Sequence, residues 1–228
     1  MAKYLIVNGD DFGASPGLNR GMVEAHRRGI LTSASLLVDA PHAQEAARSA
    51  AAFPELSLGL HADLREELDQ PSEGFHAIGA SLQRQFSRFE ELVGRPPTHL
   101  DSHHNVHRDP RALPHFRTLA REHGLPLREQ PPVRYYSKFY GQWGGQTHLE
   151  QVSVEALARM IRSEFGDGIT ELGCHPGYMD ASHVTSYGIE REAELRTLCD
   201  PRIRRVLAEE GITLIGFHHV GRIQIGAD

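Results

Sequence analysis

Short apolar runs alternate with longer amphipathic stretches along this chain. The runs are rich in β-branched and aromatic residues at strand-like length, and the stretches between them repeat apolar positions at helical spacing. We expect strands at Tyr4–Val7, Ser33–Val38, Leu56–Leu60, Thr98–His103, Leu125–Arg128, Ile169–Cys174 and Ile212–Phe217. About seven strands that alternate with helices predict a parallel sheet flanked by helices, which is an α/β fold.

The helices are expected between these strands. The predicted ranges are Pro16–Arg28, Pro41–Ala52, Leu82–Val93, Arg111–His123, Val154–Phe165, Glu190–Leu198 and Ile203–Glu210. Ser15 has the features of an N-cap with proline after it, and Gly29 ends the first helix. The segment Gln130–His148, rich in Pro, Tyr and Gly, is expected to be a substrate loop rather than a regular element. No linker or repeat divides the chain, so we expect one domain over residues 1–228.

Polar clusters follow four of the apolar runs. They contain the pair Asp10-Asp11, His61, the segment His99–His107, and His175. In barrels and in open α/β sheets, ligands bind at the carboxyl ends of the strands, where these residues are expected. One Asp and two neutral His form a mixed ligand set for a divalent cation, and a second carboxylate beside it can act as a general base. The pattern therefore predicts a metal-dependent hydrolase.

Composition and charge limit the classes of protein to which this chain can belong. The chain has 228 residues, of which 39% are hydrophobic, so it can bury one core without disulfides. A net charge of -6 and the lack of a basic stripe argue against a nucleic-acid partner. The first apolar run is too short for a signal peptide or a membrane span. Two cysteines at no zinc or redox spacing suit a reduced, cytoplasmic environment.

Each cluster also has a simpler interpretation. The pair Asp10-Asp11 could be a turn in which Asp caps a helix, and a single histidine such as His61 is more often structural. The segment His99–His107 is the strongest signal, with four histidines and an aspartate in nine residues. His99 and Asp101 could accept an N–H from the imidazoles that bind the metal and so fix their tautomers. Where the strand ends is not visible in the sequence, so His104 or His107 could replace His103 as a ligand.

Further side chains are candidates for the reaction or for the substrate. His175 could protonate a leaving amine, or it could be a turn residue at the end of a strand. Arg128 could pair with a carboxylate of the site or lie on the surface. Five aromatic residues could form a wall against a sugar or an apolar substrate, although a hydrophobic anchor for the long loop is an equal alternative: Tyr135, Tyr136, Phe139, Tyr140 and Trp143.

In combination, these motifs resemble the YdjC-like carbohydrate deacetylases. The resemblance rests on the segments Asn8–Gly13, Gly59–His61, Thr98–His107 and Cys174–Gly177, and it extends in order from Lys3 through the last strand. The nearest characterised members are chitooligosaccharide deacetylases. The resemblance implies a distorted (β/α) barrel related to that of polysaccharide deacetylases, a homodimer, and hydrolysis of the acetamide of an N-acetylated sugar or short oligosaccharide. The products would be acetate and an amino sugar.

The resemblance also implies roles for single residues. Asp11, His61 and His103 match the metal ligands, Asp10 matches the general base and His175 the general acid. The ion would be Zn²⁺ or Mg²⁺, since two imidazoles and a carboxylate suit zinc and waters can complete a magnesium shell. No nucleic acid or membrane is expected as a partner.

One stretch departs from the family. The segment between His61 and His99 looks shorter than in the chitooligosaccharide enzymes, and Asp63-Leu64-Arg65 stands where apolar residues are usual. This leaves the sugar and its chain length open. Two alternatives therefore stand beside the deacetylase: a metal-dependent hydrolase of another small amide or ester, and a metal- or sugar-binding protein without turnover. The second needs neither Asp10 nor His175.

Overall fold

A curled parallel sheet forms the centre of the molecule. The computed structural model describes residues 2–69, 74–180 and 185–223. Seven strands pair in the order β4-β3-β2-β1-β8-β5, and β9 lies beside the first half of β1. They are β1 (Lys3–Phe12), β2 (Ser33–Leu36), β3 (Ser57–Ala62), β4 (Leu100–Ser102), β5 (Val133–Tyr136), β8 (Gly168–Cys174) and β9 (Ile212–Leu214). The predicted α/β fold with about seven parallel strands is confirmed. The sheet of the expected distorted (β/α) barrel curls into a half-barrel.

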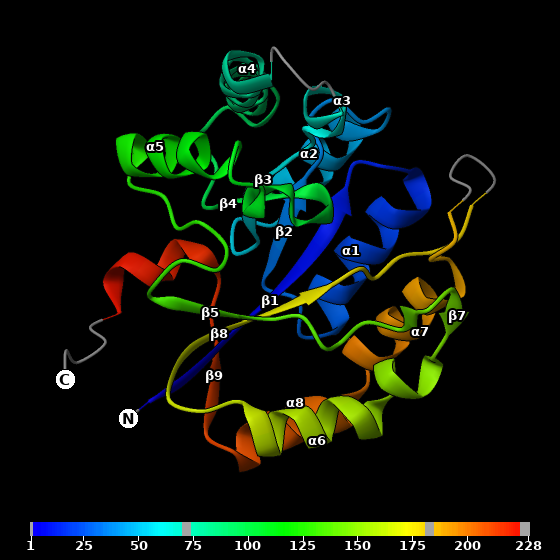
Figure 1. The fold of residues 1–228 in the computed structure, drawn as a ribbon. Helices are drawn as coiled ribbons and strands as arrows, with labels where there is room; N and C mark the ends of the chain where they lie inside the picture. Colours follow the sequence, from blue (N-terminus) through cyan, green and yellow to red (C-terminus); the bar gives the residue numbers. More distant parts are fainter. Residues whose placement is uncertain (1, 70–73, 181–184, 224–228) are drawn as a thin grey trace.

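The helices cover the outside of the curved sheet, with α4 against α5 and α6 against α8 (Figure 1). They are α1 (Pro16–Arg28), α2 (Ala43–Ala51), α3 (Arg65–Leu68), α4 (Gly74–Val93), α5 (Leu113–His123), α6 (Val154–Glu164), α7 (Ile189–Leu198) and α8 (Pro201–Glu209). Ser15 caps α1 as predicted, because its hydroxyl accepts the Leu18 N–H at 3.2 Å. None of the described helices is long and apolar enough to span a membrane.

Short 3₁₀ helices and one hairpin complete the described elements. The 3₁₀ helices are η1 (His103–Arg108), η2 (Leu149–Val152) and η3 (Phe217–Arg222), and the hairpin pairs β6 (Gln142–Trp143) with β7 (Gln146–Thr147). The helix α3 was not predicted, and α4 begins earlier than expected.

The segment from residue 125 to residue 148 differs from the prediction. The predicted strand Leu125–Arg128 makes only a single bridge, between Leu127 and Leu100 of β4. Pro126 contributes no N–H to a ladder there. The chain instead forms β5 several residues later, inside the segment predicted to be a loop, and β5 pairs with β8 from Val133↔Ile169 onwards. The long loop is therefore partly sheet, and the prediction of an irregular substrate loop was wrong for β5, β6 and β7.

The inside of the half-barrel has two layers. At the amino ends of the strands, Ile6, Ile169 and Phe217 belong to one buried apolar cluster. Above this cluster the inner face is polar. The ring of His99 stacks on Phe217 with centroids 3.8 Å apart, at the boundary of the two layers. The apolar layer lies toward the base of the half-barrel, and the residues that line the cavity lie toward the carboxyl ends of the strands.

A bulge in β1 decides where the two aspartates point. Gly9 pairs with Ala34 of β2 and Phe12 with Leu36, so β1 holds one more residue than β2 over this stretch. Asp11 has a φ of 69°, in the left-handed region that non-glycine residues rarely adopt. A bulge re-aims side chains that would otherwise alternate across the sheet. As a result, the neighbours Asp10 and Asp11 both line one cavity.

Candidate metal centre and active site

Asp11, His61 and His103 come together at the carboxyl ends of β1, β3 and β4. Oδ1 of Asp11 lies 3.0 Å from Nδ1 of His103 and 3.5 Å from Nε2 of His61. One ligand atom from each residue lies within 4.8 Å of the other two. Both Asp11 and His61 are buried, and His103 is partly buried. The structure therefore brings together the three residues that the sequence suggested as metal ligands.

Asp101 of β4 orients His61 from behind. Nδ1 of His61 lies 2.7 Å from Oδ1 of Asp101, and because a carboxylate only accepts, the imidazole donates. This leaves Nε2 directed toward Asp11, as in metal sites whose histidines donate their other N–H to a carboxylate. The other oxygen of Asp101 accepts from the Ser35 hydroxyl at 2.6 Å. Asp101 thus has the supporting position that the sequence suggested for it.

The electrostatics of these groups favour a cation. Burial would lower the pKa of His61, but the carboxylates of Asp101 and Asp10 raise it to about 10. Burial would likewise raise the pKa of Asp11, yet hydrogen bonds from His103 and His61 and the charge of Arg191 hold it well below its usual range. A proton on His61 therefore balances part of the carboxylate charge. A divalent cation would displace that proton, because metal ligands must be deprotonated. The donor set and its charge fit such an ion.

A backbone strain accompanies the site. Asp11, His104 and Asn105 all have positive φ values, of 69°, 55° and 54°, and all three line the cavity. Non-glycine residues held in this region cost free energy and occur most often where the structure fixes a functional group.

Arg128 lies at the centre of the polar layer. It is buried, and its guanidinium donates to both oxygens of Asp10 at 2.8 Å. It also pairs with Asp101 at 2.8 Å and with Glu171 at 2.7 Å. Burial would lower the pKa of Arg128, but the three carboxylates raise it well above its usual value. Of the two interpretations of Arg128, the buried partner of a site carboxylate is the one observed.

Asp10 and His175 lie in the same cavity as the three candidate ligands. Asn8 donates to Asp10 at 2.9 Å, which together with Arg128 fixes the carboxylate. His175 follows β8, and burial lowers its pKa to about 4, so its imidazole is neutral at neutral pH. The structure brings the two predicted catalytic residues together around one space.

Glu194 of α7 supports His175. Its carboxylate accepts from the backbone N–H of His175 and from the Tyr187 hydroxyl. Its Oε1 atom lies 3.9 Å from Nδ1 of His175, which has no hydrogen-bond partner among the described residues. Burial raises the pKa of Glu194 to about 8. Tyr140 packs edge-on against His175, with centroids 5.6 Å apart.

Arg191 of α7 holds the second oxygen of Asp11. Its Nη2 atom lies 2.6 Å from Oδ2 of Asp11, and its Nε donates to the Tyr187 backbone carbonyl at 3.0 Å. Oδ1 of Asp11 therefore remains the oxygen that faces the two histidines.

The neighbouring histidines have other positions. His104 lines the cavity but is turned by its positive φ. His107 is buried away from the cavity lining, with Nδ1 2.7 Å from the Ser102 hydroxyl. A regular helical turn would put His103 and His107 on one side, but His104 and Asn105 have left-handed backbone angles that interrupt it.

Two of the aromatic residues predicted to contact substrate, Tyr140 and Trp143, lie apart. Tyr140 lines the cavity and stacks on Tyr187, with centroids 4.4 Å apart and an interplanar angle of 4°. Trp143 lies in β6 and does not contribute to the described cavity lining. It is 51% exposed and stacks on His148 at 3.6 Å. The structure thus brings Tyr140, and not Trp143, to the other site residues.

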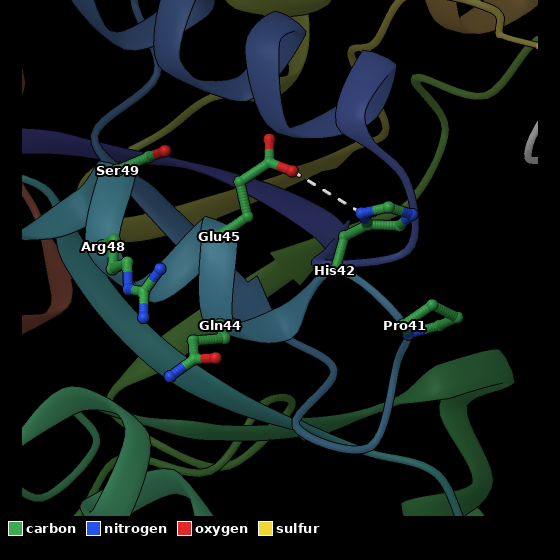
Figure 2. Close-up of a pocket in the computed structure, with 6 residues that line it drawn as sticks. All are labelled: Pro41, His42, Gln44, Glu45, Arg48 and Ser49. Carbon is green, nitrogen blue, oxygen red and sulfur yellow. Dashed lines mark ion pairs between the residues drawn. The ribbon is translucent and has the colours of Figure 1, made fainter.

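The cavity has a volume of about 980 Å³ and reaches from β1 to the first turn of α7. A separate hollow lies at the start of α2 (Figure 2). Its lining pairs His42 Nδ1 with Glu45 Oε2 at 3.5 Å. A set of three metal ligands is absent from its six described lining residues, so we place the chemistry in the larger cavity.

Glu55, His218 and His219 form a second potential ligand group, beside the amino end of β3. The backbone N–H of Gly216 donates to Nδ1 of His219 at 3.2 Å. The neutral ring of His219 then carries its proton on Nε2, so neither of its nitrogens offers a free lone pair. This group is less suited to a cation than the one at Asp11.

The sequence did not suggest Arg191, Glu194, Tyr187 or Glu171. Glu171 had a usable signal, because a carboxylate inside the buried strand Ile169–Cys174 needs a partner. The other three lie on or beside α7, about 180 residues from Asp11, where nothing in the local pattern points to β1.

Comparisons with known proteins find relatives over most of the chain. The model of the family described as YdjC-like protein matches residues 4–209. A chitooligosaccharide deacetylase of Serratia marcescens is 35% identical over 252 positions, covering 95% of this chain and 99% of that protein. A carbohydrate deacetylase of Geobacillus stearothermophilus is 36% identical over 249 positions, with 95% and 98% covered. Both alignments exceed the 228 residues of this chain, so the relatives contain residues that it lacks.

Solved structures share the fold. A candidate cellobiose-phosphate cleavage protein from Enterococcus faecalis has a TM-score of 0.81 at 26% identity, covering 96% of this chain and 99% of that one. A polysaccharide deacetylase from Bacillus cereus has a TM-score of 0.61 at 10% identity, with 95% and 92% covered, and shows the likeness of fold alone. With its family model matched over most of its length, the chain belongs to the YdjC-like protein family.

Proposed function

We propose that this protein is a metal-dependent deacetylase, which hydrolyses the acetamide of an N-acetylated sugar or short oligosaccharide to acetate and an amino sugar. The observation that carries the proposal is the set Asp11, His61 and His103, with Asp101 behind His61, in the same cavity as Asp10 and His175. The names of the full-length relatives, a chitooligosaccharide and a carbohydrate deacetylase, supply the substrate class.

Each residue of the site has its own role in the proposed hydrolysis. A divalent cation held by Asp11, His61 and His103 would polarise the acetamide carbonyl and acidify water. Asp10, fixed by Arg128 and Asn8, takes the proton of the attacking water. Its orientation by a bidentate arginine keeps the carboxylate aimed at one position, which favours the reaction by proximity.

His175 gives a proton to the departing amine. Because its pKa in the free protein is about 4, His175 must gain that proton before it can donate. Glu194, with a pKa of about 8, carries a proton at neutral pH, and its Oε1 lies 3.9 Å from Nδ1 of His175. We propose that Glu194 moves within hydrogen-bond distance of Nδ1 and passes its proton to His175 as the leaving nitrogen develops basic character.

Acetate release from N,N'-diacetylchitobiose by the purified protein is the test. Release that stops with chelator and returns with metal supports the proposal. Stoichiometric metal without release from a panel of N-acetyl sugars would reject the sugar deacetylase in favour of another amide or ester substrate. Loss of both would reject the metal site itself.

Finer properties are proposed with the function. The ion is Zn²⁺ or Mg²⁺, and metal analysis of the purified protein distinguishes them. A role in carbohydrate metabolism follows from the substrate class. A homodimer is measurable by light scattering. A cytoplasmic location is supported by Cys174 and Cys199, which are both free, and cell fractionation tests it. Arg128 is proposed to act on substrate only through Asp10, Tyr140 to contact the sugar, and Trp143 to do so only at the outer end of a longer chain.

A further inference from the structure

The side chain of Tyr135 lies on the inner side of β5 and lines the cavity together with Asp10, Asp11 and His175. The guanidinium carbon of Arg128 lies 4.6 Å from the centre of the Tyr135 ring. Arg128 in turn holds both oxygens of Asp10. The ring is therefore fixed against the same arginine that orients the proposed general base.

Gly173 of β8 leaves room for the hydroxyl end of this ring. A Cβ at Gly173 would lie 2.6 Å from the Tyr135 hydroxyl oxygen and 2.8 Å from Cε2, closer than real Cβ contacts allow. Gly173 also lines the cavity, two residues before His175. The hydroxyl of Tyr135 consequently reaches the floor of the cavity beside the strand end that carries His175.

The Tyr135 hydroxyl is a donor that no other described residue engages. None of the residues that the structure describes hydrogen-bonds it, and it lines an open cavity. The hydroxyl of Tyr187, in contrast, is engaged by Glu194 and by the backbone N–H of Gly141 at 2.8 Å. Burial raises the pKa of Tyr135, so its hydroxyl keeps its proton at neutral pH. A fixed, protonated hydroxyl of this kind is available to donate a hydrogen bond to an acceptor atom of a bound ligand.

We propose that Tyr135 donates a hydrogen bond to the acetyl oxygen of the substrate as that oxygen gains negative charge. The inference rests on the proposed deacetylase function and assigns it a further catalytic residue. A donor that is held in place before the reaction stabilises the developing charge without reorganising. Tyr135 lines the same cavity as Asp10 and His175, the two residues between which the acetamide lies in the proposed reaction.

Tyr135→Phe tests the proposal, because it removes the hydroxyl and keeps the ring over Arg128. We expect kcat to fall by ~100-fold, as for the loss of one oxyanion donor, while KM and metal content stay near wild type. Tyr136→Phe is the matched control. Tyr136 faces the other side of β5, with its ring 5.0 Å from that of Phe165, and should keep activity. An unchanged kcat in Tyr135→Phe, or a change in KM alone, overturns the proposal.

Acetate binding separates this inference from the deacetylase function. Acetate carries carboxylate oxygens that stand in for the charged acetyl oxygen, and it can be titrated into the zinc-loaded protein by calorimetry. We expect Tyr135→Phe to bind acetate ~10-fold more weakly, as for one hydrogen bond to a charged group, and Tyr136→Phe to bind it normally. Equal affinity in Tyr135→Phe overturns the donor role. Weaker binding in a protein that releases no acetate from any sugar keeps the donor and rejects the deacetylase.

Discussion

Nδ1 of His61 lies 2.7 Å from Oδ1 of Asp101, and both side chains are buried. This contact fixes the tautomer of His61 and turns its Nε2 atom toward Asp11, 3.5 Å away. Asp101 itself does not face the cavity, and it is held by Ser35 and Arg128. The orientation of a candidate ligand on β3 therefore depends on a residue of the neighbouring strand.

Asp101→Asn should weaken metal binding by ~10–100-fold, which is typical when the partner behind a ligand histidine is lost. The amide offers a weaker acceptor to His61 and also loses its charge pair with Arg128. Calorimetric titration of the metal-free protein measures the affinity. Asp109→Asn, which changes a surface carboxylate paired with Arg111, is the control. Equal affinity in the two variants would show that Asp101 does not orient the site.

His103→Ala should abolish stoichiometric metal binding, whereas His104→Ala should keep it. Of the two, only His103 has a nitrogen within 3.0 Å of Asp11 Oδ1. Metal content after dialysis, measured by mass spectrometry, distinguishes the variants. Full occupancy in His103→Ala together with loss in His104→Ala would reassign the ligand.

Asp10→Asn should retain metal and lose activity by ~10²–10⁴-fold, the usual contribution of a general base. The amide keeps the size of the side chain but cannot take a proton from water. Acetate release and metal content are measured on the same preparation. If this variant loses its metal, Asp10 is a ligand and the base must be sought elsewhere.

Arg128→Met should lower the free energy of unfolding by ~3–5 kcal/mol, because removing one partner leaves buried charges uncompensated. The charges in this case are the carboxylates of Asp10, Asp101 and Glu171. Urea denaturation gives the value, and Arg134→Met, at an exposed residue of β5, is the control. A loss of stability no larger than that of the control would contradict the central role of Arg128 in the polar layer.

The stability of the metal-free protein should fall as the pH drops from about 6.5 to about 4, in part through His99. Burial lowers the pKa of His99 from 6.5 to about 4. In that window the unfolded chain binds a proton that the folded one does not, so each pH unit costs up to about 1.4 kcal/mol. His99→Gln should flatten the dependence, while His123→Gln, an exposed histidine, should not. Urea midpoints across this pH range, with chelator present, decide between these outcomes.

The sequence by itself determined the α/β architecture and the places along the chain where the candidate site residues lie. Runs such as Tyr4–Val7 are apolar and β-rich because parallel strands are covered on both faces. Helix signals such as Ser15 with Pro16 are local, so they could be recognised without the fold. The resemblance to the YdjC-like deacetylases named Asp11, His61 and His103, and the pattern agrees with that choice, because polar residues that directly follow buried strands meet at one edge of a parallel sheet.

Only the tertiary structure decided how these residues are used. The bulge at Asp11 depends on pairing between β1 and β2, and it brings Asp10 and Asp11 into one cavity instead of onto opposite faces. Whether β5 forms at residues 125–128 or 133–136 is decided by which segment can pair with β8. Arg191 reaches Asp11 from the far end of the chain. Contacts between residues so far apart in the sequence leave no local sequence pattern, because only folding brings the two residues together.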